Sequence, residues 1–116
     1  MEKGLKFLLI NPTAPQWRVD NEGPPKKNTR VFRFSMLSSL SVAAAMPTFV
    51  KSQIVDEDVE PINFDTDADL IGISFMTYNA PRAYEIADKF RNEKKKAIIL
   101  GGYHPTFLPK EAIQHA

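Results

Sequence analysis

Four short apolar runs, separated by helical patterns and loops, constrain the fold of this chain most. They cover residues 5–10, 48–55, 70–76 and 97–100. Three of them are almost unbroken, which is typical of strands covered on both faces, whereas residues 48–55 alternate loosely and are rich in β-branched side chains. The runs therefore predict four strands. We expect residues 70–76 and 97–100 to be central strands, with helices over each face.

Helical patterns lie between these runs. Residues 36–46 have apolar side chains at helical spacing, and the small residues among them favour close packing on a sheet before Pro47 ends the helix. Pro81 begins a second helix that extends to residue 96, and Pro109 begins a third. The apolar positions of the first helix are Met36, Leu37, Leu40 and Ala44.

Strands that alternate with helices predict an α/β fold: a Rossmann-like or flavodoxin-like parallel sheet with helices on both faces. The third helix would lead into a fifth strand, and the 116 residues stop before it. We therefore expect residues 1–116 to be one domain and a fragment of a longer chain. The open sheet edge that this leaves would favour self-association.

Composition excludes several classes of function. The chain has 15 basic and 14 acidic residues, a net charge of +1, which argues against binding nucleic acid or a membrane surface by bulk charge. It has no cysteine, which excludes disulfides, thiolate metal sites and cysteine catalysis. No signal peptide or spanning segment is visible, so we expect a cytoplasmic protein. The acidic residues between 56 and 69 indicate solvated turns, and no metal site is expected there.

In parallel sheets of this kind, ligands bind at the carboxyl ends of the strands. The first such end has no glycine and carries Pro12 and Pro15, so it lacks the N–H groups that a dinucleotide or a flavin phosphate needs. Ser74 stands where a phosphoacceptor domain would need a carboxylate. The candidate site residues at the strand ends are Asn11, Pro12, Ser74, Met76, Thr77, Gly101, Gly102, His104, Pro105 and Thr106.

The loop after the last run is the most distinctive of these ends. Gly101 and Gly102 have no Cβ, so a bulky planar ligand or its tail can approach the backbone. His104 precedes Pro105, which favours an extended backbone there. The alternative is a tight turn between strand and helix that carries a surface histidine.

Three segments carry a resemblance to a known family. They are LIGIS at 70–74, NAPRAYEIA at 79–87 and ILGGYHPTFLPKEA at 99–112, the last with the pattern G-G-x-H-P-T-x-x-P. Together they resemble the N-terminal cobalamin-binding domain of cobalamin-dependent radical S-adenosylmethionine (radical SAM) proteins. The most similar branch includes anaerobic Mg-protoporphyrin monomethyl ester cyclases and related methyltransferases. The resemblance covers essentially the whole chain.

This resemblance implies a Rossmann-like sheet of five parallel strands that holds cobalamin. Ser74, Thr77, Gly101 and Gly102 would line the slot for its nucleotide tail. The D-x-H-x-x-G loop that supplies a lower cobalt ligand in some cobalamin proteins is absent, because residues 11–16 read NPTAPQ. The resemblance also implies a C-terminal radical SAM domain with the iron–sulfur cluster and S-adenosylmethionine. That domain would do the chemistry, and this fragment alone is not expected to be catalytic.

Two hypotheses stay open from the sequence. In the first, the chain binds cobalamin for a radical SAM methyltransferase or cyclase. In the second, it is a non-binding structural module that packs on the catalytic domain and gates it with residues 12–34. For His104 three roles stay open: a cobalt ligand, a polar contact to cofactor or substrate, and a plain turn residue.

Overall fold

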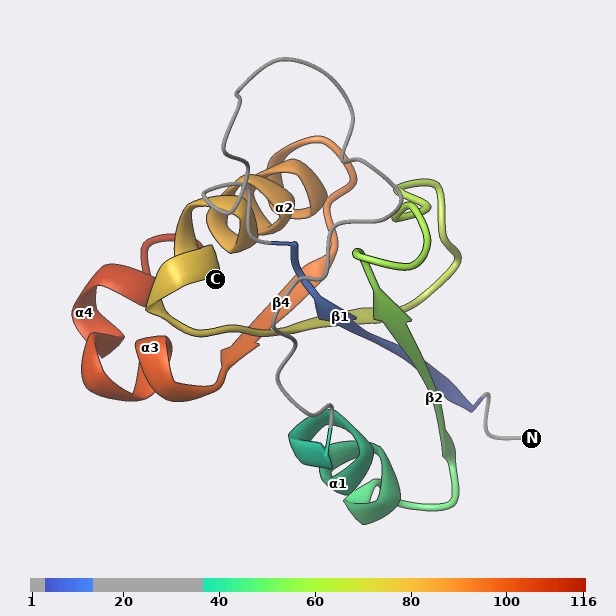
Figure 1. Cartoon of the computed structure of the whole chain (residues 1–116). Coiled ribbons are helices and arrows are strands. Elements are labelled where there is room, and N and C mark those ends of the chain that lie inside the picture. Colours follow the sequence, from blue (N-terminus) through green and yellow to red (C-terminus); the bar gives the residue numbers. More distant parts are fainter. Residues whose placement is uncertain (1–3, 14–36) are drawn as a thin grey trace.

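The structure is a computed structural model that describes residues 4–13 and 37–116. The gating segment proposed above therefore lies largely outside the described residues. The strands and helices appear along the chain as shown in Figure 1. They are β1 (Leu5–Asn11), α1 (Leu37–Ala45), β2 (Val50–Asp56), β3 (Leu70–Ser74), the 3-10 turn η2 (Thr77–Asn79), α2 (Ala80–Asn92), β4 (Ala97–Gly101), α3 (Tyr103–Phe107) and α4 (Pro109–Ala112).

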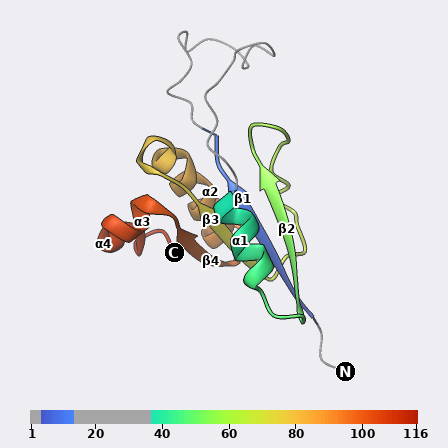
Figure 2. The ribbon, with the colours of Figure 1, turned by 60° about the horizontal axis from the view of Figure 1, so that its bottom comes forward.

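The four strands form one parallel sheet in the order β2-β1-β3-β4. The chain moves from β1 to β2 in one direction and from β3 to β4 in the other. Because such crossovers are right-handed, α1 and α2 cover opposite faces, as Figures 1 and 2 show. The α/β fold with helices on both faces is confirmed. The direction of the chain reverses between β1 and β3, where ligands bind in sheets of this kind.

The hydrophobic core lies between the sheet and α2. In α2 the residues at helical spacing are all buried, and Ile86 and Phe90 are completely buried. They pack on Leu8, Ile10 and other side chains that alternate along the strands. The strand residues of this cluster are Leu8, Ile10, Val55, Ile71 and Ile73, with Ile98 and Leu100 partly buried beside them.

The two strands predicted to be central differ in their surroundings. β3 lies between β1 and β4, and none of its residues is exposed, which confirms the prediction for it. The prediction for β4 is wrong, because β4 is the edge strand of the described sheet and Ile99 is 51% exposed. Among the described residues, α1 contacts β2, at the other side of the sheet, and Ile99 on the α1 face of β4 stays half exposed.

The first helix also turns a different face to the sheet than predicted. Leu40 is 56% exposed and Ala44 is exposed, whereas Ser39 is completely buried. The Ser39 hydroxyl donates a hydrogen bond to Asn11 Oδ1 over 2.9 Å, and this contact joins the buried side of α1 to the end of β1. Met36 lies outside the described residues. No helix in the described part of the chain is long and apolar enough to cross a membrane.

Candidate functional site

One row of residues runs across the carboxyl edge of the sheet. The register pairs Asn11 with Asp56 and Ser74 with Gly101, and it pairs Ile10 with Ile73, which places Asn11 beside Ser74. Ile10 and Ile73 belong to the core on the α2 face. Because side chains alternate along a strand, Asn11, Ser74 and the α-hydrogens of Gly101 face the α1 side. Three of the predicted site residues therefore lie next to one another on one face.

Within the described part of the chain, the α1 face is open beside this row. A Cβ at Gly101 would meet no atom of the described residues within 4 Å. Two residues earlier on the same face of β4, Ile99 is half exposed. We call Ser74, Ile99 and Gly101 the open strip. It offers an apolar floor with one hydroxyl at the carboxyl end of the sheet.

Asn11 brings an unused donor to the end of the strip. Its Oδ1 accepts from Ser39, but its Nδ2 is buried without a hydrogen-bond partner among the described residues. A buried donor in that state destabilises a fold by about 1–3 kcal/mol. An acceptor supplied by a ligand beside Ser74 would remove that penalty, so the residues present fit a bound group with polar atoms.

The two adjacent glycines have different roles. Gly102 has a φ of 102°, in the region that glycine favours, and a Cβ there would lie 2.5 Å from the carbonyl oxygen of Phe75. Gly102 is therefore required by the turn between β4 and α3. Gly101 has no positive φ, and a Cβ there would meet no atom of the described residues within 4 Å, so the described part of the chain does not require glycine at this position.

The backbone of His104 differs from the prediction, and its burial excludes the alternative of a surface histidine. His104 lies in the first turn of α3 rather than in an extended segment, and it is 6% exposed rather than a surface residue. Proline is tolerated there because the first turn of a helix has unpaired N–H groups in any case. The following Pro105 is buried, and the Thr106 hydroxyl donates to the Gly102 carbonyl over 2.7 Å. Thr106 thus closes the turn of α3.

Both ring nitrogens of His104 have partners. Nδ1 lies 3.0 Å from Thr77 Oγ1, and Nε2 lies 2.6 Å from Glu111 Oε2. Tyr84 donates its hydroxyl to the same Glu111 oxygen over 2.8 Å. Burial, and then the hydrogen bond to Glu111, raise the pKa of Tyr84 to about 12. The hydrogen bonds from Tyr84 and His104 hold the pKa of Glu111 below its usual value.

Asn79, which sequence reasoning missed, joins the loops after β1 and β3. Its Oδ1 accepts from the backbone N–H of Met76 over 2.8 Å, and its Nδ2 donates to the carbonyl of Pro12 over 3.1 Å. The predicted site residues Pro12 and Met76 are therefore fixed relative to each other through their backbones. The sequence signal for this role is an asparagine directly before the Ala-Pro start of a helix.

The acidic residues after β2 were predicted to lie in solvated turns. Glu57 departs from this prediction, because its carboxylate is bound by other residues. Arg82 donates Nε to Glu57 Oε1 over 2.9 Å and Nη2 to Oε2 over 2.6 Å, and the Thr13 N–H donates to Oε1 over 3.0 Å. The side chain of Glu57 is only 10% exposed. Burial acts to raise its pKa, but the bonds from Arg82 and Thr13 hold the pKa below its usual value.

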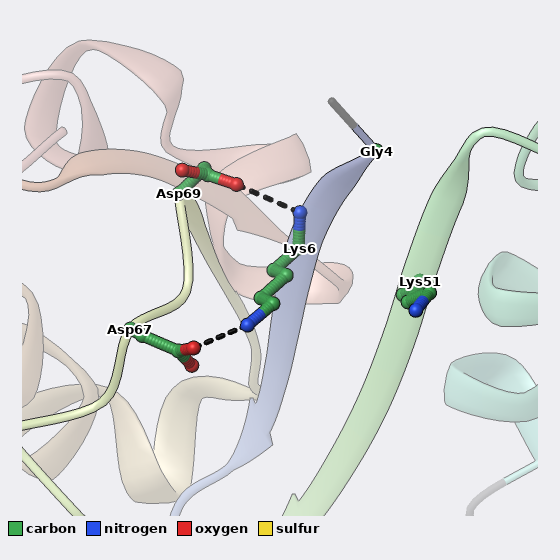
Figure 3. A pocket seen from close by; sticks show the side chains of 5 residues that line it. All are labelled: Gly4, Lys6, Lys51, Asp67 and Asp69. Atoms are coloured by element: carbon green, nitrogen blue, oxygen red, sulfur yellow. Dashed lines mark hydrogen bonds and ion pairs between the residues drawn. The ribbon is translucent and has the colours of Figure 1, made fainter. Parts of the chain in front are cut away.

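A shallow pocket lies at the opposite edge of the sheet. Figure 3 shows it lined by residues near the amino ends of β1 and β2 and by the segment before β3. Lys6 forms an ion pair with Asp67 there, and its backbone N–H donates to Asp69 over 2.9 Å. This is the edge away from the switch point, and the ion pair satisfies two of its charged side chains. Among the described residues no three His, Asp or Glu side chains gather as a metal site.

Comparison with known proteins decides the family. Residues 40–116 match the family model for the B12 binding domain. The chain belongs to the B12-binding domain family. This match begins within α1, extends past α4 and includes both Ser74 and the glycine pair.

Two curated relatives are similar to this B12-binding domain. It is 49% identical over 65 residues, 55% of this chain, to bacteriochlorophyllide d C-8(2)-methyltransferase of Chlorobaculum tepidum. It is 33% identical over 113 residues, 95% of this chain, to bacteriochlorophyllide d C-12(1)-methyltransferase of the same organism. The chain spans 14% and 23% of the lengths of these two relatives. No solved structure matches it significantly.

Proposed function

We propose that this chain is the cobalamin-binding domain of a radical SAM enzyme of the methyltransferase or cyclase type. The observation that carries this proposal is the open strip: Gly101 has free space beside Ser74 at the carboxyl edge of a sheet from the B12-binding family. A nucleotide tail needs such a strip, since it must lie along the sheet without meeting a side chain.

Three residues would hold the cofactor along the strip. The hydroxyl of Ser74 and the unpartnered Nδ2 of Asn11 would bind its polar atoms, and Gly101 would leave room for its tail. Thr77, at the carboxyl edge and exposed, would bind a further polar group of the cofactor. Cobalamin supplies one-carbon transfer chemistry when it is bound. The chain's own contribution is to bind and orient it.

This domain would hold cobalamin without a histidine as lower cobalt ligand. The chain has two histidines, His104 and His115, and neither lies in the loop directly after β1. His104 is buried between Thr77 and Glu111, and His115 lies 2.8 Å from Asp88 Oδ1 and stacks on Tyr84. Both imidazoles are therefore engaged within the domain.

The chemistry itself would belong to a further domain. Both relatives are named methyltransferases and are much longer than this chain. The chain has no cysteine, so an iron–sulfur cluster and S-adenosylmethionine would be held by that C-terminal radical SAM domain, which would also be its partner in the cytoplasm. We propose that the chain alone is not catalytic.

Size-exclusion chromatography with hydroxocobalamin tests this function. The protein is incubated with excess hydroxocobalamin and separated, and the corrin absorbance of the protein peak is measured. We expect about one corrin to co-elute with each chain. Protein that elutes free of corrin absorbance, and that shows no binding in equilibrium dialysis, would instead support the non-binding structural module.

A further inference from the structure

A line of four hydrogen-bonded side chains begins at Thr77, and its other three members have no role in the function proposed above. It runs from Thr77 through His104 and Glu111 to Tyr84. These residues come from η2, α3, α4 and α2, so the line joins every element that follows the carboxyl ends of β3 and β4 in the described chain. Only Thr77 and Glu111 are exposed.

The partner of each nitrogen sets the tautomer of His104. The pKa of Glu111 lies below its usual value, so its carboxylate is ionised at neutral pH and can only accept a hydrogen bond. Nε2, 2.6 Å from that carboxylate, must therefore carry a proton. In the neutral form of the imidazole, which has only one N–H, Nδ1 is then bare and accepts the hydroxyl proton of Thr77.

We propose that His104 is a positioning residue that fixes the direction of the Thr77 hydroxyl, so that Thr77 Oγ1 presents an acceptor to the donor groups of the cofactor. This proposal rests on the proposed function. With its proton held by His104, the Thr77 oxygen turns its lone pairs outward. Without His104 the hydroxyl can rotate, and it offers a donor as readily as an acceptor.

The burial of His104 keeps its own ring away from a ligand. Its side chain is 7% exposed, and its ring lies 5.8 Å from that of Phe75 and 6.0 Å from that of Tyr84. Tyr84 in turn fixes Glu111 through its hydroxyl and stacks on His115 at 4.0 Å. His104 is thus held from both sides, and an effect on a ligand must pass through Thr77.

Nitrogen NMR of the free chain tests the tautomer without any cofactor. In uniformly ¹⁵N-labelled protein, at a pH high enough for the ring to be neutral, we expect His104 to carry its proton on Nε2 alone. Glu111→Ala removes the acceptor and should give a mixture of tautomers, while Glu60→Ala, which removes an exposed carboxylate outside the line, should change nothing. A wild-type His104 protonated on Nδ1 would overturn the proposal.

A double-mutant cycle on hydroxocobalamin affinity tests the coupling. Thr77→Val removes the hydroxyl, and His104→Phe keeps a packed ring but removes both hydrogen bonds. Each should raise the Kd by roughly fivefold to tenfold, and the double variant by no more than the larger single effect. Glu111→Ala, on an exposed side chain that does not threaten folding, should weaken binding in the same direction.

The outcomes separate this proposal from the proposed function. If wild-type protein binds hydroxocobalamin but the two effects add, His104 contacts the cofactor itself and the positioning role is wrong. If His104→Phe leaves the Kd unchanged while Thr77→Val raises it, His104 is only structural. A wild-type chain that does not bind hydroxocobalamin overturns the proposed function, and this proposal with it.

Discussion

Arg82 in the first turn of α2 holds Glu57 after β2 in a two-pronged ion pair, with Nε–Oε1 and Nη2–Oε2 distances of 2.9 and 2.6 Å. The pair joins two elements on opposite sides of the switch point. The backbone N–H of Thr13 donates to the same carboxylate, so the loop after β1 is tied in as well. The position of Thr13 beside Glu57 therefore depends on a charge pair.

Breaking this pair should destabilise the domain. Arg82→Gln keeps a hydrogen-bonding side chain but leaves the carboxylate of Glu57, 10% exposed, without its charge partner. We expect a loss of about 1–3 kcal/mol in the free energy of unfolding, measured by urea denaturation. Arg91→Gln, on the exposed side of the same helix, is the matched control and should change it little. Equal stability of Arg82→Gln and wild type would show that the pair contributes nothing.

The same pair gives a pH dependence whose sign follows from Glu57. Because the folded-state pKa of Glu57 lies below its usual value of 4.5, the unfolded chain binds more protons than the native state as the pH falls below that value. The stabilisation is complete at neutral pH and is lost as the pH falls through the folded-state pKa. Glu57→Gln should therefore show a shallower loss of stability between neutral pH and pH of about 3. Superimposable pH profiles would contradict this.

The two glycines after β4 should separate folding from binding. Gly102→Ala places a Cβ 2.5 Å from the Phe75 carbonyl oxygen in a backbone region unfavourable to alanine, so it should destabilise the fold by about 1–3 kcal/mol. Gly101→Ala meets open space and should change stability by about 0.5 kcal/mol or less. Thermal unfolding of both variants measures the difference, and a reversed order would be inconsistent with the turn described above.

Removing the unpartnered Nδ2 of Asn11 should leave the stability of the fold unchanged or higher and should weaken cofactor binding. Replacing both members of the contact, as Asn11→Leu with Ser39→Ala, removes a buried donor that lacks a partner and leaves no new orphan. The double variant should unfold at about the same or higher urea concentration than wild type but bind hydroxocobalamin more weakly. Ser39→Ala alone is the control for stability, since it takes a hydrogen bond from Asn11. Unchanged affinity in the double variant would remove Asn11 from the site.

The open edge of β4 should support self-association at high concentration. Unpaired backbone groups on an edge strand favour pairing with a second chain, and Ile99 adds apolar surface beside them. We expect sedimentation velocity to show a growing dimer fraction with concentration, and Ile99→Lys to reduce it. A strictly monomeric profile in wild type would contradict this prediction.

Local patterns predicted the sheet well but not its edge. The apolar runs at residues 5–10 and 70–76 became β1 and β3, although β3 ends at Ser74 because the backbone turns into η2. The burial of Ile99 was overestimated, because an apolar run does not reveal whether a neighbouring element covers it. The prediction that Leu40 is buried was wrong for a similar reason. The buried face of α1 carries a contact between Ser39 and Asn11, which lie 28 residues apart in the sequence.

The candidate site, like the sheet, was predicted only in part. The strand-end rule placed Asn11, Ser74 and Gly101 together because parallel strands bring their carboxyl ends to one edge. Contacts between residues far apart in the sequence could not be predicted from local patterns. Asn79 and Pro12, for example, are 67 residues apart. A helix at residues 103–107 was missed because the proline rule for the preceding residue was applied to His104, where buried hydrogen bonds favour the helical backbone instead.

The affinity of hydroxocobalamin for wild type, Gly101→Val and Ala97→Val tests the central claim most directly. Both variants add the same branched side chain to the same face of β4, but only Gly101 lies at the carboxyl edge beside Ser74. The account predicts that wild type and Ala97→Val bind with similar Kd in equilibrium dialysis, and that Gly101→Val, folded as judged by circular dichroism, binds at least about tenfold more weakly. Equal binding by Gly101→Val and Ala97→Val would contradict it.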